Sequence, residues 1–209
     1  MTWNELVTFA AAMVTITNPI GNAALFIGMA GQRAAVERHR IVFTTVLASA
    51  IILLAVTWAG ESVLGFFGVS IPALQATGGV VISMFGLSML HARPSGLHSS
   101  KDERDEAQTK DSIAIVPLAM PIIAGPGTIT TVIVATHGHA GVANNLEISS
   151  VCLAAVLVVG ACFLAAGPIA RVLGLSGMNI LTRFMGLILT AIAIGMLAEG
   201  VKGLLPGLA

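Results

Sequence analysis

Residues 15–22 read Thr-Ile-Thr-Asn-Pro-Ile-Gly-Asn and interrupt the first long apolar stretch of the chain. Residues 121–128 read Pro-Ile-Ile-Ala-Gly-Pro-Gly-Thr and interrupt a second apolar stretch in the other half. A shift of 107 positions places Pro19 on Pro126 without a gap. Broken apolar segments at matching places of two halves are typical of transporters that bind their solute near the bilayer midplane. The sequence therefore predicts a small-solute transporter.

The composition is that of an all-α integral membrane protein. The chain is 56% hydrophobic and only 10% charged, with a mean hydropathy of +0.95, whereas soluble domains carry about 25% charged residues. A membrane-spanning helix needs about 17–25 apolar residues, and six such stretches can be drawn. They cover residues 6–28, 41–60, 72–91, 113–135, 148–170 and 180–201.

We predict two inverted three-helix repeats, in which the first and fourth helices are broken. The first repeat covers residues 1–92 and the second residues 113–209, with a charged cytoplasmic linker over 93–112. The ungapped offset of 107 runs through all three pairs of spans. Because each half has an odd number of spans, the second half enters the membrane upside down relative to the first.

The basic residues indicate how the chain is oriented. Nine of the ten Lys and Arg residues fall on the connections after the first, third and fifth spans, and only Lys202 falls on the other side. Positive charge stays on the cytoplasmic side. We therefore expect a multi-pass protein of a bacterial or archaeal cytoplasmic (inner) membrane, with both termini outward.

Each break is expected to end one half-helix and start another inside the membrane. Proline suits the first helical position, and Asn18 is a good N-cap for Pro19. The new half-helix offers free N–H groups to a carboxylate, and the ending one offers carbonyls to an ammonium group or a cation. A small neutral amino acid fits both ends, although a single proline kink in a membrane helix is often only structural. The candidate substrate-binding residues are Thr15, Thr17, Asn18, Pro19, Gly21, Asn22, Ser83, Ala124, Gly125, Pro126, Gly127, Thr128 and Thr190.

Several kinds of site are missing from the pattern. No Asp, Glu, Lys or Arg lies near the middle of a span, which argues against a substrate with a large net charge. His137 and His139 lack a third ligand and predict no metal site, and Cys152 and Cys162 are too far apart on one helix for a disulfide. We expect neither an enzyme nor a nucleic-acid partner, and no cofactor; coupling to Na⁺ or H⁺ is left open.

Several motifs resemble those of the MarC family of inner-membrane proteins. They are residues 116–121 (Val-Pro-Leu-Ala-Met-Pro), 124–129 (Ala-Gly-Pro-Gly-Thr-Ile), 183–186 (Arg-Phe-Met-Gly) and 67–72 (Phe-Gly-Val-Ser-Ile-Pro), together with Asn18-Pro19. The resemblance implies six spans and, through the SnatA-type branch, transport of small neutral amino acids such as glycine and alanine. Many relatives carry a further proline shortly after Asn-Pro, and this chain does not.

Three rival functions remain at this stage. A channel, facilitator or exporter for another small neutral solute would need a continuous pore and would not saturate. A membrane-embedded enzyme would need catalytic side chains at depth, and a scaffold subunit would bind no solute. Each broken segment could also be a re-entrant hairpin, although six full crossings give the cleaner separation of charge.

Overall fold

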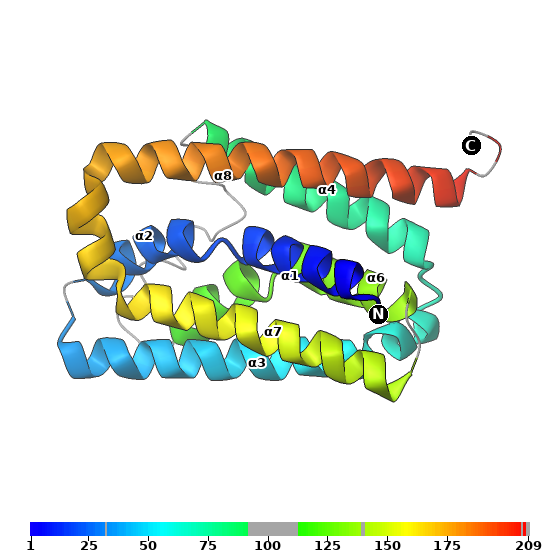
Figure 1. Cartoon of the computed structure of the whole chain (residues 1–209), viewed down its shortest axis with the longest axis horizontal. Coiled ribbons are helices and arrows are strands. Elements are labelled where there is room, and N and C mark those ends of the chain that lie inside the picture. The colour runs from blue at the N-terminus through cyan, green and yellow to red at the C-terminus, as the bar shows by residue number, and fades with distance from the viewer. Residues whose placement is uncertain (32, 92–112, 139–140, 206, 208–209) are drawn as a thin grey trace.

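The described part of the chain folds into helices joined by short connections. A computed structural model describes residues 1–31, 33–91, 113–138, 141–205 and 207, and no strand occurs within these ranges (Figure 1). The predicted linker over 93–112 lies outside the described residues, as does His139. The helices are α1 (Trp3–Thr17), α2 (Pro19–Ala30), α3 (Ala35–Phe66), α4 (Ile71–Leu90), the π-helix η2 (Ala114–Ile123), α6 (Pro126–Gly138), α7 (Val142–Leu164) and α8 (Ala166–Leu204). α8 consists of two helical parts that meet at a kink, where Gly174 has φ 61° and ψ 179°.

Five segments of the described chain are long and apolar enough to cross a membrane. They are Trp3–Ile27, Ala35–Phe66, Ile71–Leu90, Val142–Leu164 and Arg183–Leu204. The expected span over 113–135 is not among them, because it is divided into η2 and α6, and each of these is shorter than a bilayer crossing. The expected span over 148–170 is placed earlier in the chain, as α7. The chain turns at Ala165 and starts α8 just before Pro168, which a first helical turn tolerates.

The long helices form two pairs with the shorter helices between them. α4 runs beside α8 along one edge of the molecule, and α3 runs beside α7 along the opposite edge (Figure 1). Between these pairs, α2 contacts α7 and α8, while α6 contacts α3 and α4. Both chain breaks therefore lie in the middle layer.

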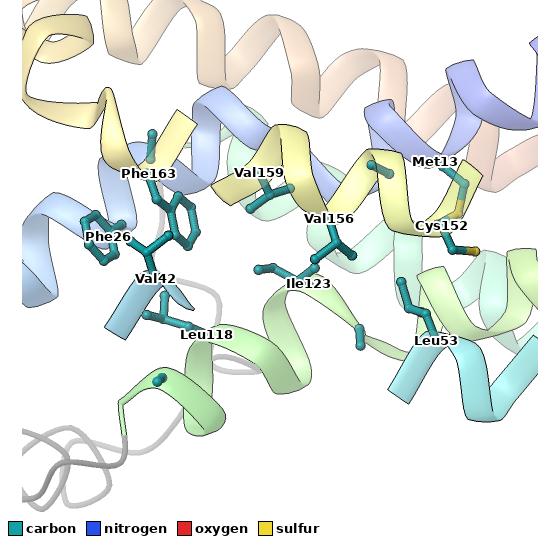
Figure 2. Close-up of a cluster of buried hydrophobic side chains, with 14 of the residues drawn as sticks. Met13, Phe26, Val42, Leu53, Leu118, Ile123, Cys152, Val156, Val159 and Phe163 are labelled. Carbon is teal, nitrogen blue, oxygen red and sulfur yellow. The ribbon is translucent and has the colours of Figure 1, made fainter. Parts of the chain in front are cut away.

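A continuous apolar core holds α1, α2 and η2 against α3 and α7. Phe26 of α2 stacks on Phe163 of α7 with ring centroids 4.8 Å apart, and Ile123 at the end of η2 is fully buried (Figure 2). Stacked rings and buried aliphatic side chains each contribute about 1 kcal/mol or more to packing. The core thus fixes η2, and with it one side of the second break.

The ion pairs between described residues lie near the ends of the helices. At the end that holds the N-terminus, the Nδ1 atom of His137 lies 2.7 Å from a carboxylate oxygen of Glu61. At the opposite end Arg33 pairs with Glu37 one turn later on the chain. Ion pairs at both ends and an apolar middle are what a bilayer imposes, because charge is costly at its centre.

Candidate functional site

The first break is built around Asn18. α1 ends at Thr17, and Asn18 adopts the left-handed conformation with φ 41° and ψ 63°, the one non-glycine residue with a positive φ in the described chain. Asparagine tolerates this conformation better than most residues. Its Oδ1 atom accepts a hydrogen bond from the Gly21 N–H at 3.2 Å, and Pro19 occupies the first position of α2. Asn18 therefore both turns the chain and caps the next helix.

Side chains of the new helix reach back to the end of the old one. The Nδ2 atom of Asn22 donates to the carbonyl oxygen of Thr17 at 2.8 Å, and the Thr17 hydroxyl donates to the Met13 carbonyl at 2.8 Å. A Cβ atom at Gly21 would lie 2.2 Å from the Asn18 amide nitrogen, so only glycine leaves room for the cap. Polar groups of the break itself thus satisfy part of the backbone that the break frees, as burial in a membrane protein requires.

The second break follows a π-helix. Proline at position 117 has no N–H with which to bond the Ile113 carbonyl in α-helical register, and the next residue, Leu118, donates to that carbonyl instead, at 3.3 Å. The wider register continues to Ala124, whose N–H donates to the Ala119 carbonyl at 2.8 Å. Single π-helical turns often occur at functional sites. This one sets the direction in which the chain enters the second break.

The second break repeats part of the chemistry of the first. α6 begins at Pro126, and the Thr128 hydroxyl donates to the Ile123 carbonyl at 2.8 Å. Gly125 stands where the first break has Asn18, but it has no side chain that could cap the new helix. At Gly127 a Cβ atom would lie 2.4 Å from the side chain of Ile82, so α4 covers the start of α6 closely.

The two breaks meet at one cavity of about 50 Å³. A water molecule needs about 10–15 Å³ by the same measure, so the cavity accepts a few waters or a solute with few heavy atoms. The polar side chains at its wall are deeply buried: Asn18 is 5%, Asn22 8% and Thr128 2% exposed. The lining residues are Ile16, Asn18, Asn22, Ile82, Phe85, Met89, Ile122, Gly125, Pro126, Gly127, Thr128 and Leu189.

Six of the residues proposed from the sequence line this cavity: Asn18, Asn22, Gly125, Pro126, Gly127 and Thr128. The other candidates do not. Thr17, Pro19, Gly21 and Ala124 are buried beside it, and the Thr15 hydroxyl donates to the carbonyl of Ala11 on its own helix. Ser83 lies on α4 outside the lining, and the Thr190 hydroxyl bonds to the carbonyl of Gly186 and packs against Gly86. Substrate binding by the lining residues stays a prediction.

Sequence reasoning missed the apolar wall of the cavity. It is formed by Ile82, Phe85 and Met89 of α4 with Leu189 of α8, and it is completed by Ile16 and Ile122. The spacing of the α4 residues puts them on one helical face. This spacing was the one feature of the sequence that could have indicated the wall. It did not suffice, because α4 is largely apolar all round, and its sequence does not distinguish the face toward the cavity from the face toward lipid.

Among the residues that the structure describes, no ionisable side chain lines the cavity. In the described part of the chain, no group of three or more His, Cys, Asp or Glu residues is placed to hold a metal ion. The groups available to a ligand are backbone N–H and carbonyl groups, two carboxamides and one hydroxyl, which together can both donate and accept hydrogen bonds.

These features define a multi-pass, all-helical integral membrane protein with a neutral cavity between two chain breaks. Residues 3–205 match the family described as MarC family integral membrane protein, and the chain belongs to this family. The resemblance seen in the motifs is thereby confirmed at the level of the family.

The relatives come from bacteria and archaea. The UPF0056 membrane protein YvbG of Bacillus subtilis is 34% identical over 207 residues, which cover 99% of this chain and 98% of the relative. A UPF0056 membrane protein of Methanocaldococcus jannaschii is 34% identical over 195 residues, 93% of this chain and 95% of the relative. The UPF0056 inner membrane protein MarC of Salmonella paratyphi A is 32% identical over 201 residues, 90% of each chain. No solved structure matches the chain.

Proposed function

We propose that this protein is a secondary transporter of small neutral amino acids such as glycine and alanine. The observation that carries the proposal is the meeting of two chain breaks at one cavity, whose described lining has buried polar side chains and no charged ones. Backbone that leaves a helix inside a membrane is tolerated where it lines a cavity, and carriers use such backbone to bind solutes. The proposal describes a carrier rather than an enzyme, since the described lining of the cavity contains no ionisable group that could take part in acid–base or nucleophilic chemistry.

The carboxylate of the solute is assigned to the start of α6. A helix N-terminus carries partial positive charge and points N–H groups at an anion. In α2 the N–H of Gly21 is already bonded by Asn18. In α6 the residue before the helix is Gly125, which has no capping side chain, and Gly127 and Thr128 line the cavity, so we assign the carboxylate to their N–H groups.

The ammonium group is assigned to the carbonyl ends of α1 and η2. The carbonyls of Thr17 and Ile123 each accept a hydrogen bond from a side chain across the break. These two residues do not line the cavity; the residues at the same helix ends that do are Ile16 and Ile122, and their carbonyls are the acceptors we propose for the ammonium group. The C-terminal end of a helix also carries partial negative charge. A zwitterion bound this way has each of its charges against a helix end of opposite sign.

We further propose that the six spans form two inverted three-helix repeats, residues 1–92 and 113–209, whose first helices are broken. Helix contacts support this. The contacts of α2 with α7 and α8 have counterparts in those of α6 with α3 and α4. Backbone bonds across the breaks correspond as well: Asn22 N–H to Asn18 O and Ile129 N–H to Gly125 O are both 2.9 Å long and are related by the same offset of 107.

The interface between α4 and α8 supports the same relation. A Cβ atom at Gly79 would lie 2.7 Å from the carbonyl oxygen of Ala193. A Cβ atom at Gly186 would lie 2.7 Å from the carbonyl oxygen of Gly86. Gly79 corresponds to Gly186, and Gly86 corresponds to Ala193, at the same offset of 107 positions. The two close backbone contacts are therefore equivalent between the repeats. Movement of one repeat against the other would then expose the cavity alternately to the two sides.

The membrane and the orientation follow from charge. We assign the protein to the cytoplasmic (inner) membrane with both termini outward, because nine of the ten basic residues fall on one side of the proposed spans. The relative from Salmonella is called an inner membrane protein, which agrees with this assignment.

The test is counterflow of labelled glycine and alanine into proteoliposomes that hold the purified protein. Variants Asn18→Ala and Gly127→Ala should lose saturable counterflow, the second because its Cβ atom collides with Ile82. Gly195→Ala is the matched control. Gly195 is also a helical glycine, but a Cβ atom there meets nothing within 4 Å, so this variant should transport normally.

Each result decides between the functions under consideration. Saturable counterflow that is lost in both site variants and kept in Gly195→Ala supports a carrier with its site at the breaks. Uptake that does not saturate and shows no counterflow identifies a channel or facilitator instead. If folded wild-type protein moves no small neutral amino acid from a full panel, the amino-acid proposal fails.

A further inference from the structure

We infer that Met89 is the residue that sets the size of the amino acid side chain accepted by the cavity. This inference rests on the proposed function and assigns a role to the wall opposite the breaks. The wall contributed by the breaks is polar, with Asn18, Asn22 and the backbone of residues 125–128. The wall contributed by α4 and α8 is apolar. A bound amino acid places its charged groups against the polar wall, so its side chain points to the apolar one.

Met89 joins the two walls. Its sulfur lies 3.8 Å from the Nδ2 atom of Asn18, at the seam between the break and α4. A thioether is a weak acceptor, so this contact holds the buried amide only loosely. Methionine is also unbranched and adapts its shape to the space available. The end of the Met89 side chain is therefore the part of the apolar wall that meets both the solute and a polar group of the site.

Its neighbours on α4 are less suited to setting the limit. Ile82 is 2% exposed and lies directly over Gly127, so its position is set by the packing of α4 on α6. Phe85 presents a rigid ring to the same cavity. Met89 is only partly buried. It packs against the cluster of Ile82, Leu189 and Ala193, and its Cβ atom would lie 2.9 Å from a Cβ atom at Gly186 of α8.

Met89→Ala is the variant that tests this role, because it shortens the side chain but keeps the Cβ atom. Alanine keeps the Cβ atom, which lies close to Gly186 of α8, and removes the Cγ, Sδ and Cε atoms, including the sulfur next to Asn18. The cavity should then admit a longer aliphatic side chain. One methylene in an apolar pocket changes selectivity by about 10–200-fold, so valine should gain at least about tenfold over glycine as a competitor in counterflow.

The control is Met84→Ala on the same helix. Met84 is half exposed and does not line the cavity, so the same truncation there should leave the ranking of competitors unchanged. Met89→Val is a milder variant that also removes the sulfur and should shift the ranking in the same direction by a smaller factor. Both Met89 variants are first checked for a single symmetric peak in size-exclusion chromatography.

The measurement is competition by unlabelled glycine, alanine, valine and leucine against labelled glycine counterflow. A gain for valine in the Met89 variants and none in Met84→Ala supports the inference. An unchanged ranking in a Met89 variant that still transports glycine overturns it, as does an equal gain in Met84→Ala. These failures differ from failure of the proposed function, in which wild-type protein itself shows no glycine counterflow.

Discussion

Replacing Asn18 by alanine should destabilise the protein more than replacing it by glycine. At φ 41° the Cβ atom of an L-residue meets its own backbone, at a cost of up to about 1–2 kcal/mol, which asparagine offsets in part by local hydrogen bonds and alanine does not. Loss of the cap on the Gly21 N–H adds about 1 kcal/mol. The expected loss for Asn18→Ala is therefore about 1–3 kcal/mol of unfolding free energy.

Asn18→Gly separates these two contributions. Glycine adopts positive φ without strain and replaces an N-cap with a loss of only a few tenths of a kcal/mol. Its greater freedom in the unfolded chain costs about 0.4–1 kcal/mol. The glycine variant should thus lose about 1 kcal/mol and remain more stable than the alanine variant by up to about 2 kcal/mol.

The assay is unfolding of the purified protein in mixed micelles at increasing mole fraction of sodium dodecyl sulfate. The control is Asn179, an exposed residue inside α8. There the order should reverse, because glycine inside a helix is less stable than alanine by about 0.5–1 kcal/mol. If alanine at position 18 is as stable as glycine or more so, the left-handed conformation assigned to Asn18 is wrong.

The same unfolding assay tests two further expectations. Gly79→Ala and Gly186→Ala should each lose about 1–3 kcal/mol, by similar amounts, since their new Cβ atoms collide with the facing helix; Gly195→Ala should lose nothing, and a large difference between the first two would contradict the correspondence of the repeats. Thr45→Val should lose about 1 kcal/mol, because its hydroxyl donates a 3.0 Å hydrogen bond to η2. Ser49→Ala should be neutral or stabilising, because its buried hydroxyl has no partner in the described part of the chain, and a loss equal to that of Thr45→Val would argue against this.

The starts of α2 and α6 could be predicted from a few residues because the chemistry there is local. An asparagine or glycine followed by proline stops one helix and starts another, and α2 and α6 begin at Pro19 and Pro126. The π-helical register before the second break also had a local signal. Prolines at positions 117 and 121 remove two donors one helical turn apart, which leaves the α-helical register incomplete.

Side-chain placement at a distance from the breaks could not be predicted in the same way. Ser83 and Thr190 were proposed from their equivalent positions in the two halves, yet neither lines the cavity. The Thr190 hydroxyl bonds to a carbonyl of its own helix, α8, and packs against Gly86 of α4. The contribution of Met89 was missed because a methionine in a membrane helix usually only packs against other apolar side chains. In water a polar face and an apolar face would separate these roles, but in lipid both faces are apolar.

The absence of charged side chains from the cavity wall has an electrical consequence. A glycine or alanine zwitterion carries no net charge, and the wall that would travel with it adds none. A membrane potential performs about 2.3 kcal/mol of work per elementary charge for each 100 mV, and on this cargo it performs none. Voltage alone would then neither accumulate nor expel the solute, and any current recorded during transport would count the coupled ions and nothing else.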